Sequence, residues 1–300
     1  MFFPVLLLIA APPTDSQTAG FQALNRGDYQ QAEEIFSKAV ATDPKDYASL
    51  FNLALAETSL KKDDLASAHY TQVLALKPGL YEAELNLGML YLRDHRPADA
   101  LPLLREAVKS KPGEGRPKRY LGDALLQTGD FVAASDSFQN ALKADPKSSV
   151  AELGLAQSLE RQGKLDDALP HYTHAAELDP RLKSYLLEEA VAMVKADRAK
   201  DAIPLLAQFP DDPGAREELG GAYLAQGRPA DAVEQFQAAV KLSPTPANNL
   251  ALATAYLKNN QPQLAAPILQ EALQSNPDDY DLRMAVGKIS LDKRDFVSAA

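Results

Sequence analysis

Cysteine and tryptophan are absent from the 300-residue sequence, and histidine occurs only 4 times. Without cysteine the chain can form no disulfide, no thiolate ligand for zinc or iron, no cysteine nucleophile and no lipoprotein anchor. The net charge of −10 has the wrong sign for a protein that coats a phosphate backbone or an anionic membrane. We therefore expect no nucleic-acid-binding role. The composition, 46% hydrophobic and 24% charged, is typical of a folded soluble protein.

Long apolar runs are also scarce, and the one present is residues 2–11 at the start of the chain. Ten residues are too few for a helix that crosses a bilayer, which needs about 20, so we expect no membrane span. The run suits the apolar part of a secretory signal, although no Lys or Arg precedes it and Pro12 follows Ala11. Residues 1–11 are therefore predicted to be a signal peptide that directs a bacterial protein to the periplasm or out of the cell. The alternative is an apolar segment that packs on the first helix pair of a cytoplasmic protein.

A repeat of 34 residues organises the rest of the sequence. One alanine recurs with spacings of 34, 34, 34, 34, 34, 30, 33 and 34 residues, at Ala32, Ala66, Ala100, Ala134, Ala168, Ala202, Ala232, Ala265 and Ala299. A small residue lies twelve positions before each alanine, a bulky one four positions after each of the first eight, and in most repeats a proline twelve after it. Apolar residues recur at steps of three and four, which predicts two amphipathic helices per repeat. The small residue lets the helices approach closely, and the proline ends the second helix.

These positions resemble the tetratricopeptide repeat (TPR) family. Its pattern of a leucine–small pair, aromatic, alanine, bulky residue, alanine and proline is matched at Leu87-Gly88, Tyr91, Ala100, Leu104, Ala107 and Pro112. The resemblance covers residues 13–300 and implies an all-α fold, a right-handed α-solenoid (superhelix) of stacked helix-turn-helix units. Eight repeats and the start of a ninth are expected, at about 13–46, 47–80, 81–114, 115–148, 149–182, 183–212, 213–245, 246–279 and 280–300.

Three departures from the repeat pattern stand out. The sixth repeat is four residues short, and the segment 209–213 predicts an early end of its second helix and an irregular joint near 207–214. Glu57 and Glu189 occupy positions that the family keeps apolar. We expect both to lie at partly exposed sites, and the alternative is a buried functional carboxylate.

Catalytic and metal-binding motifs are missing: the sequence has no phosphate-binding glycine loop, no H-E-x-x-H and no G-x-S-x-G. His171, His174 and Glu177 follow one another at steps of three, yet three ligands from one exposed helix make a weak metal site, so a solvated helix face is expected. Paired acidic residues, such as Asp211-Asp212 and Asp278-Asp279, precede or begin helices and are expected to cap them. We predict no enzyme activity, no cofactor and no metal.

A binding surface is predicted from the positions that face the concave groove in this family. The candidates are apolar or polar in repeats 2 and 3 and basic in repeat 4: Phe51, Leu55, Leu85, Asn86, Met89, Arg116 and Arg119. Two guanidinium groups on one helix could hold a peptide carboxylate. The family's carboxylate clamp is matched only at Asn86 and Arg116, so that particular clamp is not predicted. The alternatives are that the apolar residues pack on neighbouring helices and that the basic cluster is a solvated loop.

The sequence therefore predicts a protein-interaction scaffold that binds an extended peptide or a partner helix in its groove, in cell-envelope assembly, secretion or complex biogenesis. Two other interpretations remain open. The repeats could be the recognition arm of an enzyme whose catalytic domain lies beyond residue 300. The terminal repeats, if their apolar faces are unpaired, could also join copies of the chain into a homo-oligomer.

Overall fold

A computed structural model describes residues 15–292 of the chain. Within this range there are seventeen α-helices, one short 3-10 helix and no strand, which confirms the all-α prediction. None of these helices has the length and apolar character needed to cross a membrane. Residues 1–11 lie outside the described range, so the signal peptide stays a prediction.

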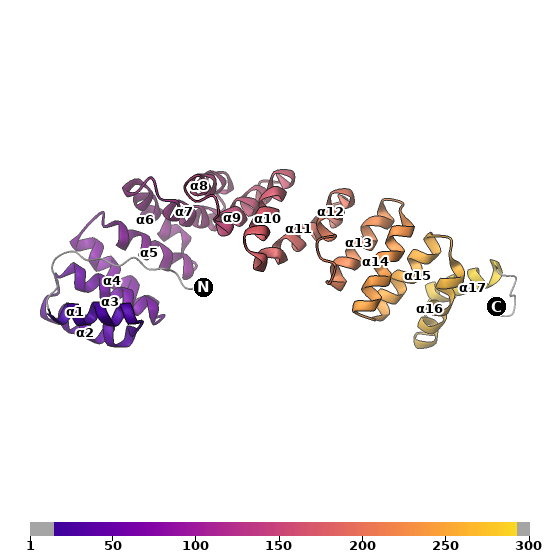
Figure 1. Cartoon of the computed structure of the whole chain (residues 1–300), viewed down its shortest axis with the longest axis horizontal. Helices are drawn as coiled ribbons and strands as arrows, with labels where there is room; N and C mark the ends of the chain where they lie inside the picture. The colour runs from indigo at the N-terminus through magenta and orange to yellow at the C-terminus, as the bar shows by residue number, and fades with distance from the viewer. Residues whose placement is uncertain (1–14, 293–300) are drawn as a thin grey trace. The chain divides into compact units, whose positions relative to one another are not determined.

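The chain divides between Pro180 and Arg181 into two compact units, each a stack of helix pairs (Figure 1). The first unit contains α1 (Asp15–Arg26), α2 (Tyr29–Thr42), α3 (Tyr47–Ser59), α4 (Asp63–Leu76), α5 (Tyr81–Arg93), α6 (Pro97–Ser110), α7 (Gly115–Thr128), α8 (Phe131–Ala144), α9 (Ser149–Arg161) and α10 (Leu165–Leu178). The second contains α11 (Lys183–Lys195), α12 (Ala199–Leu206), α13 (Pro213–Ala225), α14 (Pro229–Leu242), α15 (Pro246–Lys258), α16 (Pro262–Ser275) and α17 (Tyr280–Asp292). A 3-10 turn, Pro180–Leu182, lies at the division.

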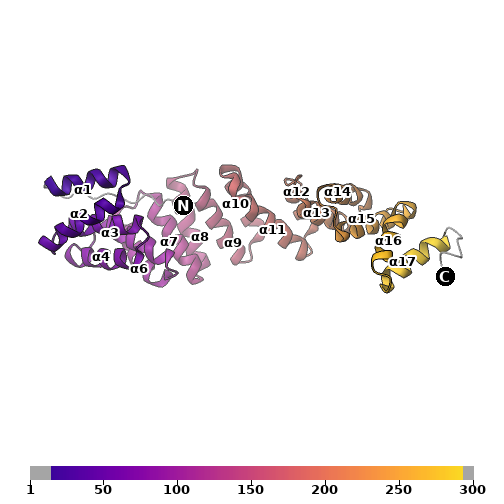
Figure 2. The same ribbon diagram turned by 90° about the horizontal axis from the view of Figure 1, so that it is seen from below.

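Helix boundaries follow the repeat. From α3 onward, the first helix of each pair begins at the first residue of a predicted repeat. The recurrent proline stands two residues after the end of the second helix, at Pro44, Pro78, Pro112, Pro146, Pro180, Pro244 and Pro277. Proline cannot continue a helix, because its nitrogen has no hydrogen to donate and its ring clashes with the preceding turn. In the first unit each helix packs on the next one, and α7 also touches the first helices on either side of it, α5 and α9. Figure 2 shows α7, α8 and α9 following one another from a second direction.

The turn inside each helix pair has one residue with left-handed backbone geometry. Glycine fills it in four repeats, at Gly27, Gly129, Gly163 and Gly227, with φ between 69° and 85°. The other four repeats place Lys61, His95, Asp197 and Asn260 there, with φ between 53° and 62°. The turn is therefore a requirement of the repeat, and repeats without glycine accept a strained residue.

The predicted contact between small and bulky residues forms the centre of the helix pairs. A Cβ atom added to Gly122 would lie 2.8 Å from the ring of Phe138, and one added to Gly220 would lie 2.8 Å from Phe236. A Cβ atom added to Gly154, in the next repeat, would also meet the Phe138 ring. Phe138 is fully buried. One aromatic side chain thus fills the space within its own pair and between two pairs.

The sixth repeat is irregular, as its sequence predicts. Its second helix, α12, has 8 residues, whereas every other complete second helix has 14. The following helix starts at Pro213, where the Asp212 carboxylate accepts a hydrogen bond of 2.8 Å from the backbone N–H of Ala215. The division into two units lies one repeat earlier than this joint.

Candidate protein-interaction surface

Five of the seven predicted groove residues are buried. Phe51 and Leu55 of α3 are 0% and 4% exposed, and Leu85, Asn86 and Met89 of α5 are 0%, 3% and 8% exposed. These side chains are part of the packing of the first unit. That they contact a partner stays a prediction.

Tyr70 links two of these residues, Phe51 and Asn86, to α4. The ring of Phe51 meets the ring of Tyr70 edge-to-face, with centroids 5.4 Å apart. The side-chain amide of Asn86 donates to the Tyr70 hydroxyl over 3.2 Å. The amide and the aromatic edge therefore fix the faces of α3 and α5 against α4.

The two remaining candidates, Arg116 and Arg119 of α7, are partly exposed. The Arg119 guanidinium binds the Asp123 carboxylate through Nη1 at 2.7 Å and lies over the ring of Tyr120 at 3.7 Å. Arg116 Nη2 approaches the sulfur of Met89 at 3.9 Å, so α5 and α7 bring these two predicted residues together. Burial raises the pKa of Asp123 to about 6, and the positive charge of Arg119 acts in the opposite direction. Arg119 therefore has an internal carboxylate partner whose charge depends on pH.

Carboxylates also offset two basic residues that precede α7 in the sequence, Lys109 and Lys111. Lys109 lies 2.5 Å from Glu106, and Lys111 lies 3.3 Å from Glu82. The Lys111 ammonium also stands over the ring of Tyr81, at 4.0 Å from its centroid. These acidic partners weaken the predicted basic cluster at Lys109 and Lys111.

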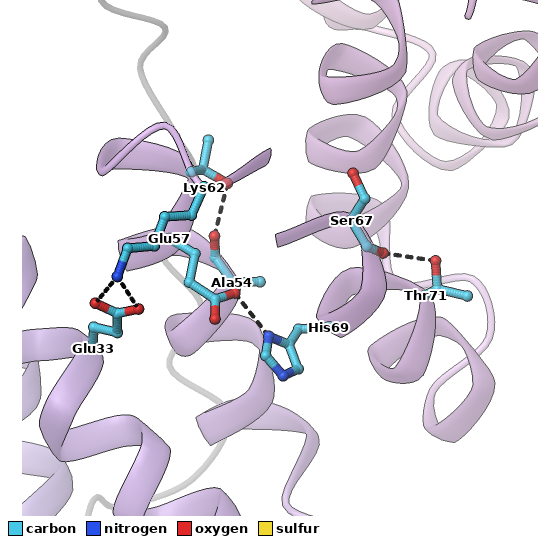
Figure 3. Close-up of polar contacts among 8 residues, drawn as sticks. Glu33, Ala54, Glu57, Lys62, Ser67, His69 and Thr71 are labelled. Carbon is cyan, nitrogen blue, oxygen red and sulfur yellow. Dashed lines mark hydrogen bonds and ion pairs between the residues drawn. The ribbon is translucent and has the colours of Figure 1, made fainter. Parts of the chain in front are cut away.

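Glu57 corrects one sequence expectation. Glu57 is 3% exposed and Glu189 is 4% exposed, so the prediction of partly exposed sites is wrong for both. The Glu57 carboxylate lies 2.7 Å from Nδ1 of His69, which reaches across from α4 (Figure 3). Figure 3 also shows the neighbouring ion pair between Lys62 and Glu33, at 2.7 Å. The imidazole satisfies a carboxylate that would otherwise be costly to bury.

A second buried carboxylate, Glu152 of α9, contacts the histidine pair of α10. Its two oxygens lie 2.6 Å from Nδ1 of His171 and 2.9 Å from Nδ1 of His174. The two rings remain 33% and 46% exposed and Glu177 is exposed, so this helix face is in contact with solvent as expected, and Glu152 is an additional partner of both rings. Sequence spacing along α10 could not reveal Glu152, because it comes from the preceding helix. Among residues 15–292, no three His, Cys, Asp or Glu side chains are placed to hold a metal ion together.

Glu84 of α5 occupies the same place in the third repeat as Glu152 in the fifth, the fourth residue of the first helix. It is 6% exposed, and its Oε2 has no hydrogen-bond partner within the described residues. Burial raises the pKa of Glu84, and the negative charge of Glu106 raises it further. At this position of the repeat, Glu152 therefore has two imidazole partners, whereas Glu84 has a negative charge nearby.

The acidic pairs take the places predicted for them. Asp212 caps α13, and the Asp279 carboxylate accepts from the backbone N–H of Leu282 at 3.0 Å. Asp63 and Asp64 lie in the first turn of α4, where the helix dipole favours negative charge. These carboxylates are explained by helix capping and the dipole.

Comparison with known proteins gives matches along most of the chain. Family models described as tetratricopeptide repeat match residues 22–81, 85–149, 121–183, 153–208, 187–246 and 223–289. The "DnaJ homolog subfamily C member 3" of Rattus norvegicus is 22% identical over 303 aligned positions, which cover 87% of this chain and 59% of that protein. The "Cellulose synthase 2 operon protein C" of Komagataeibacter xylinus is 28% identical over 251 positions, covering 79% and 19%. The chain therefore spans less than two thirds of either relative.

Solved structures named MamA resemble part of the chain. "MamA AMB-1" is 28% identical, with a TM-score of 0.53, over 56% of this chain and 99% of that one. MamA from Desulfovibrio magneticus RS-1 is 22% identical, with a TM-score of 0.53, over 55% and 94%. These likenesses agree with an all-α solenoid of stacked helix pairs.

Proposed function

Because the chain belongs to the tetratricopeptide repeat family, we propose that it is a protein-interaction scaffold whose first unit binds an extended peptide or a helix of a partner protein. The observation that carries the proposal is the pair Arg116 and Arg119 on α7. Both side chains are partly exposed, and they occupy the second and fifth places of a first helix, which face the groove in this family. A relative from Fusarium oxysporum named "Tetratricopeptide repeat and J domain-containing co-chaperone DNJ1", which is 37% identical over 79 residues, supports a role in protein binding.

The chemistry of α7 favours a partner that offers hydrogen-bond acceptors. A guanidinium carries five N–H donors, and charge-assisted bonds to a carboxylate are about twice as strong as neutral ones. Asp123 accepts from Nη1 of Arg119, so an acceptor on the partner would share or displace Asp123. Met89 lies beside Arg116 and adds an adaptable apolar contact at the same place.

A charge-reversal pair tests this surface. Arg116→Glu with Arg119→Glu is compared with Arg105→Glu with Lys109→Glu, because both doubles change the net charge equally and the second pair lies on the exposed face of α6. Each bait carries the same appended epitope and is captured from native extract by an antibody to it, and bound proteins are quantified by mass spectrometry. Circular dichroism checks that each variant is folded. We expect a set of partners that the α6 variant retains and the α7 variant loses; equal retention by both would contradict the proposal.

We also propose that the protein works in the cell envelope of a bacterium. Support comes from the apolar residues 2–11 and from the bacterial relative named for a cellulose synthase operon. Fusion of residues 1–30 to a phosphatase that is active only outside the cytoplasm tests the idea. Phosphatase activity is expected, and it should disappear when Leu7 and Leu8 are changed to arginine. An inactive wild-type fusion would instead favour the cytoplasmic alternative.

The enzyme-arm alternative has one specific observation in its favour. The human "Protein O-mannosyl-transferase TMTC3" is 27% identical over 119 positions, which cover 39% of this chain but only 13% of that protein. The remainder of such a relative leaves room for a catalytic domain. The sequence of the complete reading frame distinguishes the two: a further folded domain favours the arm, and a stop soon after residue 300 favours the scaffold.

Self-association through the terminal repeats is a separate proposal. On α17 the side chains of Tyr280 and Met284 are 71% and 56% exposed, which leaves apolar surface for a second copy. Light scattering across a concentration series tests it. A mass that rises with concentration, and that falls back when both residues are changed to serine, is expected; a constant monomer mass would contradict it.

A further inference from the structure

The two imidazoles of α10 and the carboxylate of α9 form a group that partner binding does not use. Nδ1 of His171 lies 2.6 Å from one oxygen of Glu152, and Nδ1 of His174 lies 2.9 Å from the other. The Glu152 side chain is 8% exposed, whereas the two rings are 33% and 46% exposed. A buried carboxylate therefore holds two rings whose outer parts reach solvent.

The carboxylate decides which ring nitrogen carries the proton. An ionised carboxylate only accepts hydrogen bonds, so each imidazole must donate to Glu152 through its Nδ1–H group. In a neutral imidazole with a proton on Nδ1, the second nitrogen, Nε2, has a lone pair. Glu152 thus selects the same tautomer in both rings, the one that can bind a metal ion through Nε2.

The spacing of the rings is equally suited to sharing an ion. Residues three apart on a helix are neighbours on one face, and here the two oxygens of one carboxylate hold the Nδ1 edges of both rings. Histidines that bind metals nearly always donate their other ring N–H to a carboxylate, a carbonyl or water. We propose that His171 and His174 bind one Zn²⁺, Ni²⁺ or Cu²⁺ ion through their Nε2 atoms, with Glu152 as the positioning residue. Imidazole suits these ions, and water fills the other coordination positions, since no third side chain converges there within residues 15–292.

The arrangement is particular to the fifth repeat. In the third repeat, Glu84 takes the place of Glu152, but the residues at the two histidine positions are Leu103 and Glu106. In the second repeat, His69 has its own buried carboxylate, Glu57, and is a single imidazole. His69 is therefore an internal comparison: it has an orienting carboxylate without a second ring.

Proton NMR offers a direct test, because 4 histidines give few imidazole signals. The untagged full chain is titrated with Zn²⁺, and the signals are assigned from single His→Ala variants. The His171 and His174 signals are expected to shift together and to saturate at one ion per chain, before those of His69 and His95 respond. No shift of the pair at millimolar Zn²⁺, or equal shifts of all four histidines, would overturn the proposal.

Three variants separate ligands from the positioning residue. His174→Ala should abolish the joint shift. Glu152→Gln should weaken Zn²⁺ affinity about ten- to hundredfold, the usual loss when such an orienting partner is removed, and should change the tautomer reported by imidazole ¹⁵N shifts. Glu177→Gln is the matched control, since it removes one negative charge from an exposed position of α10, the helix that carries both histidines. The Zn²⁺ affinity of this variant should stay within about twofold of that of the unchanged protein. Equal losses in Glu152→Gln and Glu177→Gln, or none in Glu152→Gln, would contradict the role of Glu152.

Discussion

At the scale of single residues, the buried carboxylates show how one position in a repeat can have different environments. Glu152 has two imidazole partners, whereas Glu84 has Glu106 nearby and an oxygen without a hydrogen bond in the described part of the chain. Burying a charge without compensation is costly, so a raised pKa is the expected response at Glu84. The contribution of Glu84 to the free energy of unfolding therefore depends on pH.

Glu84→Gln is predicted to stabilise the protein at neutral pH. The pKa of Glu84 is higher in the folded than in the unfolded state, so its favourable contribution is complete below the unfolded pKa and is lost as pH rises through the folded pKa. A neutral amide avoids this loss, so the free energy of unfolding at pH 7 should rise. Urea unfolding at pH 7 and pH 4 measures it, and the gain should shrink at pH 4. The exposed Glu34→Gln is the control; an equal gain there would contradict the explanation.

Asp123 provides a second prediction at this scale. Its carboxyl group should titrate near pH 6 in the folded protein, because burial outweighs the attraction of Arg119. Arg119→Gln removes that attraction and should move the pKa of Asp123 further upward. Carbon-13 NMR of the aspartate carboxyl groups follows both titrations. A lower pKa in the variant would show that Arg119 acts on Asp123 in another way.

At the scale of helix pairs, the close approach of two helices depends on the small residue of each repeat. The adjacent glycines of α13 separate packing from helix propensity. A Cβ atom at Gly220 would lie 2.8 Å from the ring of Phe236, whereas one at Gly221 would have no atom within 4 Å. The same substitution on neighbouring residues should therefore have opposite effects.

Gly220→Ala is predicted to destabilise the protein by about 1–3 kcal/mol, because the Phe236 ring must move within a close-packed site. Gly221→Ala should stabilise it by about 0.5–1 kcal/mol, because alanine favours the helix and meets no obstacle. Urea unfolding followed by circular dichroism measures both. A similar change of either sign in the two variants would mean that the contact with Phe236 does not limit the approach of α13 and α14.

The helix pairs also show how far the sequence predicts the structure. The spacing of Gly122 and Phe138 is sufficient to predict both helices and their contact, because this contact is local and repeats. The approach of His171 to Glu152 is not predictable in the same way, because no other repeat has glutamate and histidine at these two positions. Predicted groove residues such as Leu85 occupy the family's positions, but their burial depends on how neighbouring helices pack. Regular positions therefore predict the fold, and irregular side chains determine the sites.

At the scale of the whole chain, the sequence irregularity and the structural division do not coincide. The shortened sixth repeat indicates an irregular joint at 207–214, yet the division into two compact units falls between Pro180 and Arg181. Proline at 180 is regular for the repeat, so it gives no signal of a division there. The chain continues from this proline as a 3-10 turn in place of the usual link, a feature of backbone geometry that periodicity does not encode.

The division into two units predicts that a destabilising substitution in one unit leaves the stability of the other unit unchanged. In a solenoid each repeat contacts only its neighbours, so stability is approximately a sum over repeats and interfaces. Gly220→Ala should speed amide hydrogen exchange in α13, α14 and the adjoining helices of the second unit, and leave α1–α10 unchanged. Exchange followed by mass spectrometry of the full chain measures this, with Gly221→Ala as the control that should slow exchange in the same helices. Faster exchange spread evenly over both units would show that the chain unfolds as one cooperative body, because protection in the first unit would then depend on packing in the second.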